Sequence, residues 1–344
     1  MRGYISVQPP VNLVPEEEYL FLPHLRYQLD TLKVKRIKNV FITYSGLCVN
    51  RTGLIKECHH WYPWYYDSYM SEVAGFQRQV ESDPDQLIVF DDDNVYLSVF
   101  HPWYNYYHWI CESIFRLWMV REQAREMILV LPEYYRSSGF IMPSLEKFRF
   151  KNIYFIPQFK SLLVRNLCLP QIKPWVDGYD KRKLRQVRDF YLHDVLPDKK
   201  LDLNLGERLY VSRKKAARKK VINEPELEDL LHAFGFTIIN NEDYTFFEQL
   251  SIFSHAKYLI SIHGSGLTNM LFMKENAHIL EFQKRSTNDR DWHSRAFWYL
   301  ADALGYSYYH QLCEPTDPAD DYYHANLTVS AARLENDIRR MLSH

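Results

Sequence analysis

One turn in the second half of the chain combines residues that suit the binding of a phosphate group. It reads His263-Gly264-Ser265-Gly266 and follows a short apolar run, Tyr258–Ile262, which predicts a buried strand. Glycines let a backbone approach a ligand closely, and a strand–turn–helix unit presents backbone N–H groups to an anion. The turn therefore predicts a diphosphate site, with plain tight-turn packing as the alternative.

A group of basic residues stands where it could serve the same anion. Arg213, Arg218, Lys219 and Lys220 follow a run, Arg208–Ser212, that predicts another strand. In a parallel sheet the carboxyl ends of both strands share an edge, so these side chains and the glycine turn would lie together. Arginine and lysine side chains with backbone N–H donors are the groups that a diphosphate needs. A solvated charged segment is the alternative.

The pair His108 and Glu112 suits acid–base chemistry. These residues are four apart in a segment with helical apolar spacing from Tyr107 onward, so they share one helix face. Glu112 is flanked by apolar turns, and we expect burial to raise the proton affinity of its carboxylate, as a general base near neutral pH requires. Metal binding by this pair is one alternative. Simple pairing of Glu112 with Arg116 is the other, and it is favoured when this feature is taken alone.

Two further segments carry residues that could meet a ligand. His59–Met70 concentrates aromatic residues in what we expect to be a polar loop, and tryptophan and tyrosine faces stack on sugar rings. Packing of these aromatics into the core or an interface is the alternative. Asp91–Asp93 could hold a divalent metal beside a diphosphate, but a hairpin between Leu87–Phe90 and Val95–Phe100 is favoured because aspartate forms turns.

The elements that must position these residues alternate between strand and helix. We expect a hairpin at residues 40–50 and an α/β domain that ends near Pro170, followed by a doubly wound parallel sheet. The strands expected in the second half are Arg208–Ser212, Phe236–Asn240, Tyr258–Ile262, Ala277–Phe282 and Tyr306–Leu312. The helices expected there are Asp180–Leu196, Glu224–Phe234, Phe246–His255, Leu267–Met273, Trp292–Leu304 and Ala331–Leu342.

Local signals predict where several of these helices begin and end. Asn223 is a candidate N-cap, Thr245 and Glu248 form a capping box, and Gly305 provides a natural stop. The last helix is amphipathic, and we expect it to pack back on the first domain. The resulting division is residues 1–172, residues 173–328, and a C-terminal helix at 329–344.

Composition excludes some classes of protein. The net charge is −1, so bulk electrostatic attraction to nucleic acid is not expected. The five cysteines are scattered and form no CxxC pair, which argues against a disulfide framework or a zinc site and favours a reducing compartment. No apolar run approaches the length of a membrane span, and the first residues do not read as a signal peptide. We expect a cytoplasmic protein, with peripheral association with the inner membrane as a further option.

The combination of motifs resembles glycosyltransferase family 61 over about residues 85–315. The motifs are Arg213, Arg218, Asn223 and Glu224 in the pattern R-x(4)-R-x(4)-N-E, then Phe247-Glu248-Gln249, HGSGLTN from His263, Ile279–Glu281, and NYYHWICE at Asn105–Glu112. The combination is specific, although each motif alone is not.

The resemblance implies a GT-B-like fold, with two Rossmann-like domains facing a central cleft, and inverting transfer from a nucleotide sugar. Residues 1–172 would then be the acceptor-side domain and residues 173–328 the nucleotide-sugar-binding domain. It implies Glu112 as the base that deprotonates the acceptor hydroxyl, with His108 orienting it or touching the donor sugar. The implied donor site consists of Arg213, Arg218, Lys219, His263, Gly264, Ser265, Gly266, Asn269 and Glu281, with Glu281 holding the ribose hydroxyls.

The resemblance also bears on partners and setting. Protein cations neutralise the departing diphosphate, so no metal or other cofactor is required. The nucleotide is expected to be UDP. Outside the range of the resemblance, Trp61, Trp64 and Tyr65 of the aromatic segment are expected to bind a glycan or glycolipid acceptor. The implied setting is bacterial surface polysaccharide synthesis, such as capsule or lipopolysaccharide. A metal-dependent transferase that uses Asp91–Asp93 and a non-catalytic glycan-binding subunit remain the alternatives.

Overall fold

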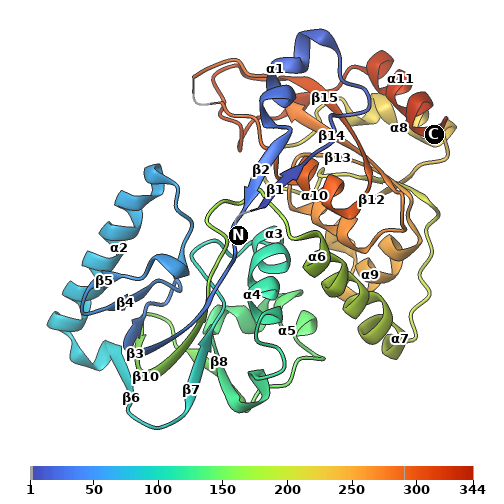
Figure 1. The fold of residues 1–344 in the computed structure, drawn as a ribbon. Coiled ribbons are helices and arrows are strands. Elements are labelled where there is room, and N and C mark those ends of the chain that lie inside the picture. Colours follow the sequence, from blue (N-terminus) through green and yellow to red (C-terminus); the bar gives the residue numbers. More distant parts are fainter. Residues whose placement is uncertain (1–2, 290, 344) are drawn as a thin grey trace. The chain divides into compact units, whose positions relative to one another are not determined.

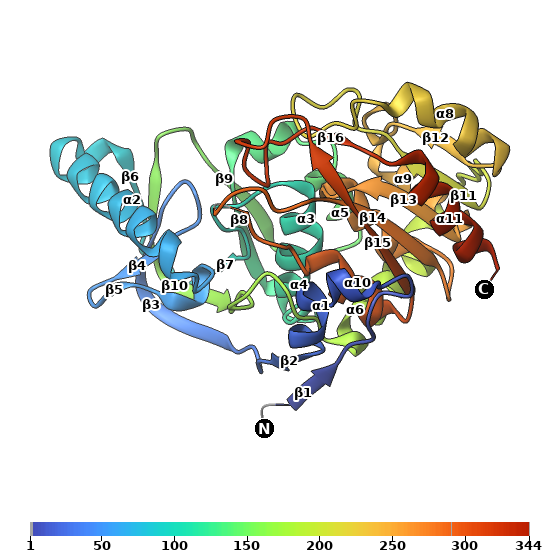
Figure 2. The ribbon, with the colours of Figure 1, turned by 90° about the horizontal axis from the view of Figure 1, so that it is seen from above.

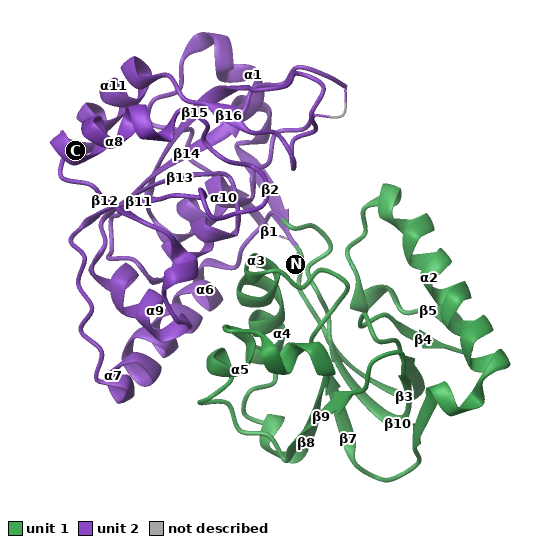
Figure 3. Cartoon of the chain, turned by 180° about the vertical axis from the view of Figure 1, so that it is seen from behind, with its two compact units in different colours: residues 1–2, 30–176 green, residues 3–29, 177–344 purple. Residues whose placement is uncertain are grey.

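The computed structural model describes residues 3–289 and 291–343, which form two compact units (Figure 3). Unit 1 contains residues 30–176, and unit 2 contains residues 3–29 and the described residues from 177 onward. The sequence had placed residues 1–172 in one domain. The first segment instead joins unit 2, where β1 (Gly3–Ser6) pairs with β2 (Arg26–Leu29) and the Val11 N–H donates to the Tyr308 carbonyl at 2.8 Å.

Unit 1 is built on an eight-stranded mixed sheet. The strand order is β5-β4-β3-β10-β7-β8-β9, and β6 also pairs with β10. β6, β7, β8, β9 and β10 are parallel, whereas β3, β4 and β5 pair antiparallel. The strands are β3 (Val34–Ile42), β4 (Cys48–Asn50), β5 (Gly53–Leu54), β6 (Leu87–Phe90), β7 (Val95–Ser98), β8 (Met127–Pro132), β9 (Asn152–Ile156) and β10 (Ser161–Pro170). The expected hairpin at residues 40–50 is the β3–β4 pair.

The helices of unit 1 are short apart from the first. They are α2 (Pro63–Ser82), α3 (Tyr106–His108), a π-helical turn (Trp109–Ser113), α4 (Ile114–Trp118) and α5 (Ile141–Ser144). Single 3₁₀ turns lie at Lys56–Cys58, Pro84–Gln86, Ala124–Glu126 and Glu133–Ser137. The predicted polar loop at His59–Met70 was wrong in its second half, because Pro63 begins α2 and proline suits the first turn of a helix.

The acidic segment Asp91–Asp93 does not close a hairpin. β6 and β7 both pair with β10 and follow each other along it, so the segment interrupts the strand position next to β10. The Asp92 carboxylate accepts hydrogen bonds from the Asn94 N–H at 2.9 Å and the Tyr96 hydroxyl at 3.0 Å. Asp92 therefore stabilises a turn, as predicted, but the predicted pairing of the two flanking strands with each other was wrong.

Unit 2 contains a second mixed sheet with the order β12-β11-β13-β14-β15-β16. The strands are β11 (Arg208–Val211), β12 (Thr237–Ile239), β13 (Tyr258–Ile262), β14 (His278–Lys284), β15 (Ser307–Pro315) and β16 (Leu327–Thr328). The first five are parallel, and only β16 pairs antiparallel. Counted along the chain, the parallel strands have the order 2-1-3-4-5, a doubly wound arrangement whose direction changes between β11 and β13. The predicted parallel sheet is confirmed.

The helices of unit 2 follow the predicted alternation. They are α1 (Glu18–Phe21), α6 (Lys181–Asp189), a π-helical turn (Phe190–Val195), α7 (Leu196–Lys199), α8 (Glu224–Ala233), α9 (Phe246–His255), α10 (Ala296–Leu304) and α11 (Ala331–Leu342). 3₁₀ helices lie at Pro15–Glu17, Leu22–His24, Asn241–Asp243 and Ser265–Phe272. The Thr245–Glu248 capping box and the left-handed Gly305 at the end of α10 are both present. Asn223 stands at the N-cap position of α8, as predicted, but its side chain makes no capping hydrogen bond and bonds to the backbone of Val329 instead.

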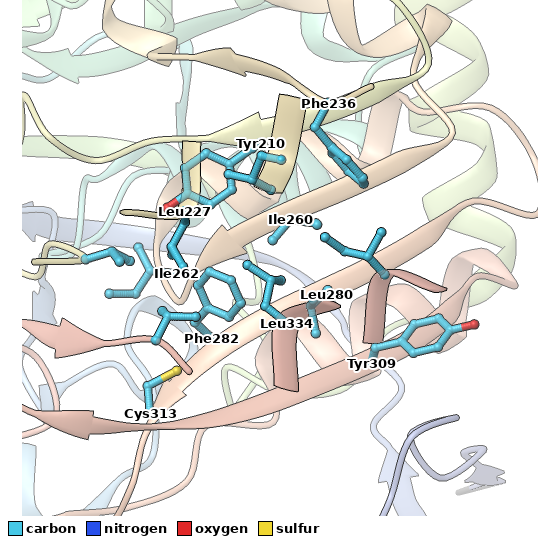
Figure 4. Close-up of a cluster of buried hydrophobic side chains, with 14 of the residues drawn as sticks. Tyr210, Leu227, Phe236, Ile260, Ile262, Leu280, Phe282, Tyr309, Cys313 and Leu334 are labelled. Atoms are coloured by element: carbon cyan, nitrogen blue, oxygen red, sulfur yellow. The ribbon is translucent and has the colours of Figure 1, made fainter. Parts of the chain in front are cut away.

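Helices α8 and α11 lie side by side on one face of this sheet (Figures 1 and 2). Figure 4 shows the buried cluster beneath them, where Leu227 and Leu334 meet Ile260, Leu280 and Phe282 from the strands. The amphipathic α11, which we expected against the first domain, thus buries its apolar face in unit 2. It packs on the apolar side of the sheet. Along β14, residues that face this side alternate with residues that face a more polar side.

Candidate functional site

The segment that carries His108 and Glu112 is a helix with a widened turn. The Asn105 side chain caps its start by accepting the His108 N–H at 3.2 Å. The π-helical turn Trp109–Ser113 then contains Glu112 before α4 begins. Such turns are rare and recur at functional sites. The predicted shared face is confirmed, because the His108 Nδ1 lies 2.7 Å from the Glu112 Oε2.

Three more polar side chains surround the same carboxylate. The Nε2 atoms of His60 and His101 each lie 3.2 Å from the Glu112 Oε2. The Lys173 ammonium lies 3.8 Å from the Oε1. The Glu112 side chain is fully buried, whereas those of His108 and Lys173 are each 14% exposed. The carboxylate is therefore hidden, and His108 and Lys173 are the members that reach the surface of unit 1.

The hydrogen bonds assign protons to the imidazoles. The His60 Nδ1 lies 3.0 Å from the Lys173 carbonyl, which can only accept, so this nitrogen carries a proton. The Trp103 N–H donates to the His101 Nδ1 at 3.4 Å, which leaves the His101 proton on Nε2, toward Glu112. The contact at 2.7 Å places the His108 proton on Nδ1. The His108 Nε2 then keeps a lone pair, and no described residue hydrogen-bonds to it.

The charge state of the cluster differs from our expectation. Burial alone would raise the pKa of Glu112, as predicted, but the surrounding imidazoles of His60, His108 and His101 hold it well below its usual range. Burial lowers the pKa of His101 to about 3 and also lowers the pKa of His108. At neutral pH the cluster thus contains an ionised Glu112 beside a neutral His108.

Arg116 is not the partner of Glu112. Its buried guanidinium donates to the carbonyls of Pro170 and Val99, both at 2.7 Å, and to that of Phe100 at 3.0 Å. These carbonyls lie at or beyond the carboxyl ends of β10 and β7. Arg116 therefore ties the helical segment to the edge of the sheet and leaves the carboxylate to the imidazoles.

The cluster also has the composition of a metal site. His60, His101, His108 and Glu112 offer ligand atoms within 4.8 Å of one another, the only such group among the described residues. The Trp103 N–H argues against this use, since a liganded His101 would carry its proton on Nδ1, where it would face that donor. The carboxylates of Asp91 and Asp93 lie 3.8 and 3.3 Å from Arg165 and form no such group.

The predicted acceptor residues lie around the start of α2. Trp64 is 70% exposed, and the indole N–H of Trp61 donates to the Lys56 carbonyl at 2.9 Å. The Tyr65 ring meets Trp103 at a centroid distance of 4.8 Å. The sequence analysis did not single out Trp103, whose indole stacks on His60 at 4.5 Å. The position of Trp103 in the sequence, between His101 and His108, was the signal that could have indicated its role.

In unit 2 the basic residues and the glycine turn share one edge, as predicted. β11 and β13 are parallel neighbours, so Arg213 and His263 both follow carboxyl ends at the point where the strand order reverses. A side chain at Gly264 would place its Cβ 2.7 Å from the Arg213 Nη1. A Cβ at Gly266 would lie 3.1 Å from the Asn241 side chain. A side chain at Gly264 would therefore displace the Arg213 guanidinium from its present position.

The residues after the turn have structural partners. Ser265 begins a 3₁₀ helix, Ser265–Phe272, where we had expected a helix at Leu267–Met273. The buried Asn269 donates to the Gln249 side chain at 2.8 Å and so ties this helix to α9. Gln249 in turn donates to the carbonyls of Asn241 and Tyr244. These contacts fix the position of the turn.

A second histidine–glutamate pair lies at this edge. The His263 Nδ1 pairs with the Glu281 Oε1, and the Tyr308 hydroxyl donates to the Glu281 Oε2 at 2.6 Å. The Glu281 side chain is fully buried. Burial and the nearby Lys219 lower the pKa of His263. Both carboxylate oxygens are therefore engaged within the chain, and the visible role of Glu281 is to hold the imidazole.

Lys219 is an unusual cation for a donor site. It is 5% exposed, and burial lowers the pKa of its ammonium to about 7. The Nζ lies 4.1 Å from the centroid of the Tyr322 ring, a residue that the sequence analysis did not single out. The Arg213 Nε donates to the Lys219 carbonyl at 3.2 Å. Arg218 instead pairs with the exposed His324.

The sequence of the chain decides its family. The family model named glycosyltransferase 61 matches residues 106–280, just over half of the chain. This chain belongs to glycosyltransferase family 61. The matched range begins one residue after Asn105 and ends one residue before Glu281, so it contains both histidines of the two pairs and the HGSG turn. The enzyme is accordingly a transferase that acts on a sugar donor and an acceptor.

Two further findings complete the comparison. No curated protein matches this glycosyltransferase. Within the described ranges, no helix combines the length and hydrophobicity that a membrane crossing requires.

Proposed function

We propose that this glycosyltransferase is an inverting enzyme that uses His108 as its base and Glu112 to orient and stabilise it. The observation that carries the proposal is the short contact between the His108 Nδ1 and a buried carboxylate, which leaves the Nε2 lone pair available. The family resemblance had implied Glu112 as the base. Burial of that carboxylate favours the reverse order, in which the imidazole accepts the proton.

The proposed reaction is a single displacement. The His108 Nε2 takes the proton of an acceptor hydroxyl as that oxygen attacks the anomeric carbon. The bond from this carbon to the nucleoside diphosphate breaks, and its electron pair leaves with the phosphate. Glu112 stabilises the imidazolium that forms, which is the role of the carboxylate in a base–carboxylate pair.

The donor side of the proposal uses the edge of the second sheet. Arg213, Lys219 and the backbone N–H groups that follow Gly264 would hold the diphosphate and neutralise its charge as it leaves. UDP as the nucleotide, independence from metal, and the GT-B arrangement are parts of this proposal that the family resemblance supports. An acceptor glycan bound near Trp61, Trp64 and Tyr65 rests on the ability of these aromatic rings to stack on sugars. A place in bacterial surface polysaccharide synthesis rests on the resemblance.

Nucleotide binding tests the donor site. Thermal shift and calorimetry with UDP, GDP and CMP should show one nucleotide that stabilises the wild-type chain in EDTA, because a ligand bound to the native state raises the melting temperature. Arg213→Ala should weaken that binding about 10- to 100-fold, the value of a charge-assisted contact. Arg339→Ala, at an exposed helical site, should leave it unchanged.

Two outcomes would contradict the proposal. If no nucleotide binds, the donor site is wrong. If binding and transfer both disappear in EDTA and return with a divalent ion, the four-residue cluster or the aspartates hold a metal after all.

A further inference from the structure

A cavity in unit 1 is lined by residues that do not belong to the histidine cluster. Its volume is about 410 Å³, within the range of small-molecule sites. The lining combines aromatic rings with hydrogen-bonding groups and consists of Tyr44, Tyr104, Glu133, Tyr134 and Gln158. Neither the sequence analysis nor the family match assigns this cavity a role.

The cavity is formed at the edge of the sheet where ligands bind in α/β proteins. Tyr104 follows β7, Glu133 and Tyr134 follow β8, and Gln158 follows β9, which are neighbouring parallel strands. Their carboxyl ends therefore supply most of the lining. One short segment serves both sites, since His101 and Trp103 belong to the histidine cluster and Tyr104 belongs to the cavity.

The lining chemistry suits a sugar ring. The Tyr134 ring lies 5.5 Å from Tyr44 and 5.4 Å from Tyr104, and the latter pair is edge-on, so the rings present faces in different directions. Such faces pack against the C–H groups of a pyranose, while the phenol, carboxylate and amide groups can bond to hydroxyls. Burial raises the pKa of Tyr134 to about 12, so its hydroxyl remains a donor at neutral pH.

The charge of the lining separates this cavity from the donor site. Glu133 is its one charged residue, and neither lysine nor arginine lines it. The Glu133 carboxylate would repel a diphosphate. The same carboxylate can accept hydrogen bonds from two hydroxyls of an uncharged sugar. The lining thus favours an uncharged pyranose over a nucleotide.

We propose that the cavity lined by Tyr44, Tyr104, Glu133, Tyr134 and Gln158 binds a pyranose unit of the acceptor. This inference rests on the proposed function, because it gives the acceptor side of that reaction a site at the edge that carries His108. The three tyrosines hold the ring, and Glu133 and Gln158 select its hydroxyls.

Saturation-transfer NMR and titration on the full chain test this site. The probes are the methyl glycosides of glucose, galactose, mannose and N-acetylglucosamine, with UDP as a separate ligand. At least one glycoside should bind the wild-type chain, and Tyr134→Ala should weaken it about tenfold, the value of a well-packed aromatic contact. Glu133→Gln should weaken it severalfold. Tyr19→Ala and Glu126→Gln, at exposed positions elsewhere, should have no effect.

The outcomes separate the two proposals. Loss of glycoside binding with unchanged UDP binding supports the cavity. Glycosides that bind equally well to Tyr134→Ala, or that do not bind the wild-type chain while UDP does, would overturn the cavity and leave the proposed function standing. Failure of UDP and every other nucleotide to bind would count against the proposed function itself.

Discussion

The two units each contain a buried glutamate that contacts the Nδ1 of a histidine, but the two pairs have different neighbours. In unit 1, Glu112 holds His108 among other imidazoles, with one ammonium 3.8 Å away. In unit 2, Glu281 holds His263 beside Lys219, whose charge helps to lower the pKa of that imidazole. The pair in unit 1 is thus surrounded mainly by imidazoles, whereas the pair in unit 2 lies beside cations.

The difference shows that the neighbours, rather than the pair itself, determine the chemistry. A neutral imidazole oriented by an ionised carboxylate can accept a proton, and the His108 Nε2 has no hydrogen-bond partner among the described residues. A neutral imidazole beside lysine and arginine contributes to an anion site, where additional charge on the ring would be repelled by the same cations. The following predictions test this contrast.

Removing either imidazole should affect a different property of the enzyme, the transfer rate for His108 and the nucleotide affinity for His263. His108→Ala should reduce the rate of transfer about 10²- to 10⁴-fold, the usual contribution of a general base, and leave nucleotide affinity unchanged. His263→Ala should instead weaken nucleotide binding. Rates of transfer and calorimetric affinities for both variants provide the measurement, with His193→Ala at an exposed site as the control. A His108→Ala variant that transfers sugar at nearly the wild-type rate would end the comparison.

The pH dependence of the transfer rate should reflect the unusual state of His108. The base must be neutral to act, so the rate should fall as the pH drops through its pKa. Because burial lowers that pKa from its ordinary value, the acid limb of the pH–rate profile should lie below the range of a free histidine, about 6.5. An acid limb above this range would contradict the assignment.

Lys219 should make nucleotide binding depend on pH in unit 2. With a pKa near 7 the free enzyme loses this charge as the pH rises, and a bound diphosphate favours the charged form. Affinity for UDP should therefore fall by up to about tenfold per pH unit above 7. Calorimetry between pH 7.5 and about 9, where the phosphate is fully ionised, should show proton uptake on binding. Lys219→Met should abolish the uptake.

The smallest effect is expected from the glycine turn. Gly264→Ala places a methyl group 2.7 Å from the Arg213 Nη1, so the guanidinium must move. We expect nucleotide affinity to fall severalfold, since part of one charge-assisted contact is lost. Gly139→Ala meets no atom within 4 Å and serves as the matched control. Equal affinities of the two variants would mean that Arg213 does not contact the ligand in its present position.

Local sequence signals predicted several parts of this enzyme correctly. The strand before HGSG, the Thr245–Glu248 capping box and the stop at Gly305 depend on residues close in the chain. The shared face of His108 and Glu112 follows from helical spacing alone. The common edge of Arg213 and the glycine turn followed from the parallel sheet, because every parallel strand ends on the same side.

The errors concern contacts between residues that are distant in sequence. Asn223 stands at the start of α8 as expected, but its side chain bonds to the backbone of Val329 instead of capping the helix. The runs on either side of Asp91–Asp93 were read as a hairpin, yet both pair with β10. In each case a distant segment competed with the local preference and won, and nothing in the local sequence reports that competitor.

The sequence by itself determined the family, the alternation of elements and the residue types at each site. Only the tertiary structure decided their chemistry. Folding brings His60, 52 residues away, to the Glu112 carboxylate, where the imidazoles together lower the pKa of Glu112 despite its burial. Folding also packs Tyr322 against Lys219. Proton affinity depends on the distance and burial of surrounding charges, which the spacing of residues along a chain does not specify.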